Sequence, residues 1–117
     1  MSEADVESLA LAYYEAIDGG DYERLEGLLA PAFRHVRGDR TIEGRGAFVR
    51  FMREGRPRTD TSHEVDAVYA VESDEEVAVR GRLFHADGSV WFGFVDVFHV
   101  EDGRLARLTT YTNNRVS

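Results

Sequence analysis

One carboxyl group of this sequence stands among aromatic residues. Asp96 lies between Phe94 and Phe98 in the segment 89–100, where an extended backbone would place all three side chains on one face. An ionised carboxylate is poorly solvated in such surroundings, so it needs a hydrogen-bonding partner or a raised pKa. Both are typical of a carboxyl group that moves protons in a pocket. The alternative is a structural aspartate bonded to backbone amides or to an arginine.

Two further side chains could take part in proton transfer. His35 shares a short alternating segment with Phe33 and Arg37, and an imidazole of near-neutral pKa suits a general base. Tyr13 offers a phenolic donor at the end of an apolar ring. The alternatives are a hydrogen-bonded structural histidine and a tyrosine that only packs in the core. Spacing along the chain does not by itself unite these residues with Asp96.

The motifs of several other chemistries are missing from the sequence. It contains no P-loop, no dinucleotide-binding glycine fingerprint, no HExxH pair and no G-x-S-x-G motif. It has no cysteine, and its four histidines do not have the spacing of metal ligands. We therefore expect no metal site and no cofactor.

The residues that could do chemistry must be positioned by a set of helices followed by a set of strands. Apolar residues at intervals of three and four predict helices over 3–18, 22–29 and 44–54, with Ser2 and Asp21 as caps and Pro31 after the second helix. Alternation predicts a short strand over 32–37 and longer strands over 63–72, 76–86, 89–100 and 104–112, with a loop over 56–62.

This order of elements predicts an α+β fold in which three helices pack on a mainly antiparallel sheet, and 117 residues suit a single domain over 1–117. The segment 89–100 is apolar on both faces, so both faces need cover. We expect its outer face, with Trp91, Val95 and Val97, to pack against a second copy of the chain. Arg80 and Arg82 would border that interface or remain solvated.

The charge of the chain excludes some partners. It has 22 acidic and 14 basic residues and a formal net charge of −8, which disfavours binding to nucleic acid or to an anionic membrane. With no basic leader and no long apolar segment, a cytoplasmic protein is expected. All of the basic residues are arginine, a bias that fits either a GC-rich genome or adaptation to high salt.

Several segments together resemble the nuclear transport factor 2-like superfamily, which includes ketosteroid isomerases and SnoaL-type polyketide cyclases. They are YYEAIDGGD at 13–21, LLAPAF at 28–33, IEGRGAF at 42–48, VDVF at 95–98 and DGRL at 102–105. The resemblance spans residues 5 to 113 and implies a cone closed by a strongly curved sheet. It also implies that Tyr13 and a protonated Asp96 bind an oxyanion, and that His35 replaces the carboxylate base of the isomerases.

Two functions follow as expectations. In the first, His35 moves a proton next to a carbonyl or activates water, with Asp96 either neutral as a donor or ionised as the partner of His35. In the second, the cone holds a small apolar molecule without transforming it. In both, we expect the ligand to contact a set of largely apolar side chains: Phe33, Phe51, Phe92, Phe94, Phe98, Leu108, Thr110 and Thr112.

Overall fold

The computed structural model describes residues 6–56, 60–70 and 75–113. Its N-terminal half contains α1 (Val6–Gly19), α2 (Tyr22–Leu28), β1 (Leu29–Val36), β2 (Thr41–Glu43), α3 (Arg45–Arg50) and the π-helical turn η1 (Phe51–Gly55). The strands β3 (Ser62–Ala70), β4 (Glu76–Phe84), β5 (Val90–Glu101) and β6 (Arg104–Thr112) follow. Helices therefore precede most of the sheet, and the predicted α+β class is confirmed.

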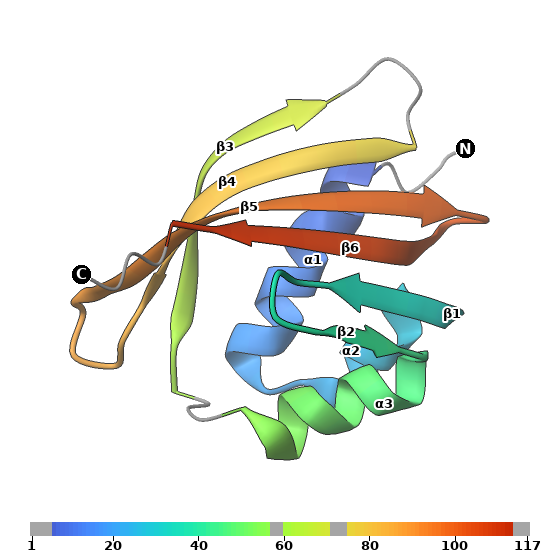
Figure 1. Ribbon diagram of the computed structural model, residues 1–117, viewed down its shortest axis with the longest axis horizontal. Helices are drawn as coiled ribbons and strands as arrows, with labels where there is room; N and C mark the ends of the chain where they lie inside the picture. Colours follow the sequence, from blue (N-terminus) through green and yellow to red (C-terminus); the bar gives the residue numbers. More distant parts are fainter. Residues whose placement is uncertain (1–5, 57–59, 71–74, 114–117) are drawn as a thin grey trace.

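The sheet has the strand order β2-β1-β6-β5-β4-β3. The pair β1 and β6 is parallel, whereas all other neighbours are antiparallel, so the sheet is mixed but mainly antiparallel as predicted. Figure 1 shows the long strands curving around α1, with α3 below the short strands β1 and β2. This curvature leaves the inner face of the sheet wrapped around the helices.

The first two helices follow the local signals of the sequence. The side chains of α1 at intervals of three and four, among them Leu9, Tyr13 and Ile17, are buried against the sheet. The helix ends at Gly19 and is followed by Gly20, whose positive φ of 70° suits glycine. Asp21 caps α2 as predicted, because its side chain accepts a hydrogen bond from the backbone N–H of Arg24.

The structure corrects the ends of two predicted helices and adds one strand. Helix α2 ends at Leu28, and Pro31 lies inside β1 instead of following a helix, because the buried Leu29 already pairs with Leu105 of β6. Strand β2, which the sequence did not predict, pairs with β1. The predicted helix over 44–54 is α-helical only to Arg50 and continues as the wider turn η1. Residues 57–59 of the predicted loop, 71–72 of a predicted strand and the predicted cap Ser2 lie outside the described residues.

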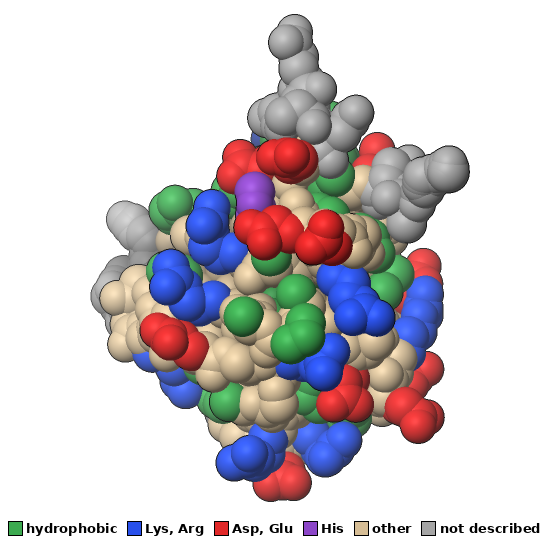
Figure 2. All heavy atoms as spheres, turned by 90° about the vertical axis from the view of Figure 1, so that its right-hand side faces the viewer, with side chains coloured by type: hydrophobic (Ala, Val, Ile, Leu, Met, Phe, Trp, Pro, Cys, Tyr) green, Lys and Arg blue, Asp and Glu red, His purple; other side chains and the backbone are tan. Residues whose placement is uncertain are grey.

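The core lies between α1, α3 and the concave face of the sheet. Phe33, Phe48 and Phe98 are fully buried there, and Phe48 contacts Phe33 with ring centroids 4.9 Å apart. At the end of the molecule on the right of Figure 1, acidic and basic side chains are interspersed (Figure 2). None of the helices in the described ranges has the length and hydrophobicity needed to cross a bilayer.

Candidate functional site

A cavity of about 250 Å³ opens between the helices and the concave face of the sheet. Its walls come from α1, β1, the turn after β1, η1 and strands β3 to β6. All three residues predicted to do chemistry, Tyr13, His35 and Asp96, contribute to this lining. Tertiary packing thus brings together side chains that are far apart in the sequence.

Asp96 lies in the middle of β5 and is held by two hydroxyl groups. The hydroxyl of Tyr14 donates to Oδ2 at 2.7 Å, and the hydroxyl of Thr110 donates to Oδ1 at 2.7 Å. Only 5% of the residue is exposed, and this burial raises the pKa of Asp96, although the two hydrogen bonds oppose the shift. The carboxyl group is therefore oriented by its neighbours and biased toward its neutral form.

His35 is connected to Asp96 through Thr110. Its Nε2 lies 2.8 Å from Oγ1 of Thr110, whose hydroxyl proton is already donated to Asp96. The hydroxyl oxygen must then accept, so Nε2 of His35 carries the proton and Nδ1 keeps its lone pair. Nδ1 is buried and has no hydrogen-bond partner among the described residues.

The surroundings of His35 favour its neutral form. Burial and, next, the positive charges of Arg37 and Arg40 lower its pKa to about 4. At neutral pH, therefore, His35 is an uncharged donor to Thr110 and not an imidazolium. Its ring also packs edge-on against Phe48, with centroids 5.3 Å apart.

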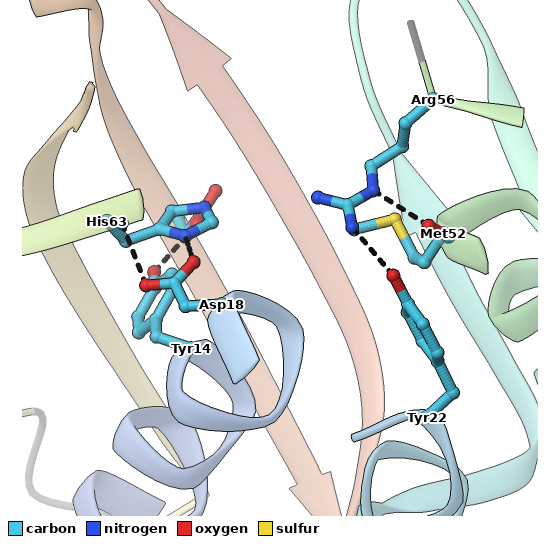
Figure 3. A network of polar contacts seen from close by, with 7 residues as sticks. Tyr14, Asp18, Tyr22, Met52, Arg56 and His63 are labelled. Atoms are coloured by element: carbon cyan, nitrogen blue, oxygen red, sulfur yellow. Dashed lines mark hydrogen bonds and ion pairs between the residues drawn. The ribbon is translucent and has the colours of Figure 1, made fainter. Parts of the chain in front are cut away.

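A second histidine in the cavity wall is oriented by a carboxylate. His63, at the start of β3, donates from Nδ1 to Oδ1 of Asp18 at 2.6 Å, while its backbone N–H donates to Oδ2 at 2.8 Å. Its ring contacts Tyr14, with centroids 4.9 Å apart, and Phe94, with centroids 5.6 Å apart. With Nδ1 engaged, Nε2 is the nitrogen left for a ligand (Figure 3).

The sequence reasoning missed His63, Asp18 and Tyr14. Tyr14 and Asp18 are four residues apart on α1, a spacing that places two polar groups on neighbouring turns of one helix face. That spacing was a usable signal for a polar cluster. Their partners were not visible, because Asp96 follows Tyr14 by 82 residues and His63 follows Asp18 by 45.

Tyr13 and Tyr14 take different places although both are buried. Tyr13 lines the cavity, stacks on Phe48 and meets Phe98 edge-on with centroids 5.2 Å apart. Burial and, next, the nearby Asp96 raise the pKa of Tyr13 well above its ordinary value. The hydroxyl that bonds Asp96 nevertheless belongs to Tyr14, which the sequence reasoning had not selected.

The expected ligand-contacting side chains divide into two groups. Phe51, Phe92, Phe94 and Thr110 line the cavity. The other four lie elsewhere: Phe33, Phe98 and Leu108 are at most 1% exposed and form the core beneath it, and the exposed Thr112 lines a shallow hollow that Arg80 and Val95 share. Regular alternation identified most of the inner face, with Thr112 as an exception, but it could not separate the cavity wall from the packed core.

The structure corrects the predicted position of Trp91. It was expected on the outer face of the sheet with Val95 and Val97, but it lines the cavity. The register explains the difference, because Leu83 pairs with Phe92 while the next residue, Phe84, pairs with Val90. Trp91 is therefore the extra residue of a β-bulge, which breaks the alternation of side chains.

Arg56 enters the cavity from the end of η1. Its Nε donates to the carbonyl oxygen of Met52 at 2.8 Å, and its Nη2 donates to the hydroxyl of Tyr22 at 2.9 Å. Figure 3 shows its guanidinium group directed toward the side of the cavity that carries His63, whose ring Asp18 holds. Within the described ranges, no group of three or more His, Asp or Glu side chains has the geometry to hold a metal ion.

Comparison with solved structures relates this fold to several bacterial proteins. A protein of Kribbella flavida described as a candidate ketosteroid isomerase is 26% identical, with a TM-score of 0.81 over 94% of this chain and 78% of that chain. A candidate polyketide cyclase of Sinorhizobium meliloti is 20% identical, with a TM-score of 0.76 over 88% of this chain and 93% of that chain. A protein of Methylobium petroleophilum with a cystatin-like fold gives a TM-score of 0.82 at 14% identity, over 100% of this chain and 81% of that chain.

A search of curated protein sequences found no significant match. The model of the SnoaL-like domain family, in contrast, matches residues 10–108, which include most of α1, the turn after β1 and most of every strand. This match agrees with the resemblance seen in the sequence and with the similar solved structures named above. The chain therefore belongs to the SnoaL-like domain family.

Proposed function

We propose that this protein is an enzyme that transfers protons on a small carbonyl compound bound in the cavity. The observation that carries the proposal is the convergence of an oriented imidazole and a buried carboxyl group on one cavity. One is His63, whose ring is oriented by Asp18, and the other is Asp96, whose pKa is raised by burial. An imidazole nitrogen with a lone pair and a neutral carboxyl group at one site can act as a base and as a hydrogen-bond donor.

His63 is the residue that we assign as the base. Because Nδ1 donates its proton to Asp18, the lone pair of the neutral ring is on Nε2. That nitrogen can remove a proton from a carbon atom next to a carbonyl group and return it to another position. His35 is the competing assignment from the sequence, but its lone pair is on a fully buried Nδ1 and its pKa is low. We therefore give His35 the role of positioning Thr110 and, through it, Asp96.

Asp96 is the residue that we assign as the donor to the developing oxyanion. Each of its oxygens accepts one hydroxyl hydrogen bond, so each keeps a further position at which a proton can reside. A neutral carboxyl group donates that proton to a negatively charged oxygen, and Tyr13 in the same wall supplies a second hydroxyl. The similarity to the candidate ketosteroid isomerase of Kribbella flavida supports a ketone-like substrate.

The proposal can be tested with nitrobenzisoxazole, a neutral aromatic probe. A base removes its C–H proton while the N–O bond breaks, and the coloured nitrophenolate forms without any co-reactant. We expect His63→Gln to lower kcat/KM by roughly 100-fold or more, the usual contribution of a general base, and Asp18→Asn to lower it less. His99→Gln is the matched control, because His99 lies beside Glu76 and Glu101 outside the cavity lining.

Two results would contradict this assignment. A rate lost in His35→Gln and kept in His63→Gln would make His35 the base. If the folded wild-type protein bound the probe but converted it no faster than free imidazole does, the cavity would be a binding site without catalysis.

A further inference from the structure

The cavity differs in charge from the protein as a whole. The chain carries a net charge of −8, yet Arg37, Arg40 and Arg56 all line the cavity. Asp96 is the only carboxylic acid in the described lining, and burial favours its neutral form. An acidic protein thus places positive charge in the wall of this cavity, where it attracts an anionic ligand.

Arg56 is held firmly but without a counter-charge. Both of its hydrogen bonds go to neutral acceptors, the carbonyl of Met52 and the hydroxyl of Tyr22, and no carboxylate pairs with it in the described part of the chain. These contacts use Nε and one hydrogen of Nη2, so the other N–H groups are left for a ligand. A preorganised guanidinium group is well suited to bind a planar carboxylate through two parallel hydrogen bonds.

Arg37 and Arg40 add positive charge to the cavity wall from the turn after β1. Both lie near the exposed Asp39, with nitrogen–oxygen distances of 3.4 and 4.0 Å, so their charge is only partly compensated. Arg40 also covers the ring of Phe51, with its guanidinium carbon 4.7 Å from the ring centroid. Their field reaches the interior, because both lower the pKa of His35.

The remaining wall is aromatic. Phe92 and Phe94 face the cavity from β5, and the bulge adds Trp91, whose ring lies 4.8 Å from that of His85. Such a wall favours a flat apolar body over a hydrated one. A free inorganic anion would satisfy the arginines but would leave this surface without a partner.

We propose that the natural substrate is a small aromatic carboxylate whose anionic group binds Arg56, while Arg37 and Arg40 attract it and its ring lies against Trp91, Phe92 and Phe94. This proposal rests on the proposed function, because it places the reacting part of the same ligand near His63 and Asp96. It adds that the substrate carries a negative charge remote from the reacting atoms. A neutral ketone of the same size would be a poor ligand.

Binding can be measured by calorimetry with phenylacetate and with phenylacetamide, which has the same shape but no charge. We expect the wild-type protein to bind phenylacetate at least roughly tenfold more tightly, as a charged hydrogen-bonded pair implies. Arg56→Gln should remove this preference, and Arg56→Lys should retain part of it. Arg50→Gln is the matched control, because it removes the same charge from the exposed end of α3.

Equal affinity for the acid and the amide would overturn the proposal, and so would a preference that survives in Arg56→Gln. Phosphate that binds as tightly as phenylacetate would also overturn it, because the aromatic wall would then contribute nothing. His63→Gln separates this proposal from the proposed function, since it should keep the preference for the acid. Turnover of nitrobenzisoxazole without an acid preference contradicts only the present proposal, and an acid preference without turnover contradicts only the proposed function.

Discussion

Burial shifts the pKa values of His35 and Asp96 in opposite directions, but both shifts favour an uncharged side chain. It lowers the pKa of the imidazole to about 4 and raises the pKa of the carboxyl group, so it favours the neutral form of each. Thr110 connects the two with hydrogen bonds of 2.8 and 2.7 Å. A neutral relay of this kind can position a proton without the desolvation cost of a buried ion pair.

The low pKa of His35 predicts a pH-dependent stability. Between its ordinary value of 6.5 and the folded value of about 4, the unfolded chain binds more protons, so the free energy of unfolding falls as the pH falls. The full shift corresponds to about 3 kcal/mol. His35→Gln lacks this titration, and we expect it to lose about 3 kcal/mol less than the wild type between pH 7 and pH 4. Urea unfolding at both pH values measures the difference.

Asp96 titrates in both proteins, so the comparison isolates His35. The raised pKa of Asp96 affects stability in the opposite direction. The folded state then binds more protons than the unfolded chain, so the free energy of unfolding falls as the pH rises through that range. Unfolding energies of the two proteins that remain parallel from pH 7 to pH 4 would show that His35 is not held neutral by the fold.

At the scale of secondary structure, register shifts between neighbouring strands shape the cavity. The register of β4 and β5 shifts next to Phe84, and the register of β3 and β4 shifts between Val65 and Ala67. Near the second shift, Gly81 packs so closely that a Cβ atom would meet the backbone oxygen of Glu64 and Cζ of Phe94, the latter at 2.8 Å. The two strands and the cavity wall can come this close only where β4 has no side chain.

Gly81→Ala is therefore expected to destabilise the protein by about 1–3 kcal/mol, the usual effect of overpacking. The backbone of Glu64 cannot yield easily, so Phe94 should be displaced within the cavity wall. Gly27→Ala is the matched control, because it lies in α2 with no atom within 4 Å of the added Cβ, and it should stabilise by up to about 1 kcal/mol. Thermal unfolding of both variants measures the effect, and equal melting temperatures would contradict the close approach.

At the scale of the whole molecule, the outer face of the sheet is the surface on which a second copy of the chain could pack. Val95 and Val97 are half-buried there, Tyr69 is 50% exposed and Tyr111 is 60% exposed. Beside them, the guanidinium group of Arg82 donates hydrogen bonds to the carboxylates of Glu64 and Asp66. This mixture of apolar centre and paired charges fits an interface between two copies of the chain, which remains a proposal.

We expect the protein to sediment as a dimer at micromolar concentration. Val97→Asp should give monomers, because it would bury a charge at the centre of the interface. Val90→Asp, on the same strand but 51% exposed at its start, should leave the dimer intact. Analytical ultracentrifugation distinguishes the two masses, and a monomeric wild type would refute the expectation.

Local patterns in the sequence predict much of this molecule. The periodicity of apolar residues placed α1 and the four long strands, and the position of Asp96 among phenylalanines indicated a buried carboxyl group. These features depend on neighbours within one helical turn or one strand, which the sequence displays directly.

Tertiary structure alone decided which groups meet. Tyr13 and Tyr14 both belong to the buried face of α1, and only the crossing of that helix over β5 assigns the bond to Tyr14. In the same way, the packing of β3 beside α1 brings His63 to the carboxylate of Asp18. A shift of one residue in the register of β5 directs Trp91 into the cavity. Such contacts depend on the register and packing of segments distant in sequence, and no local periodicity encodes them.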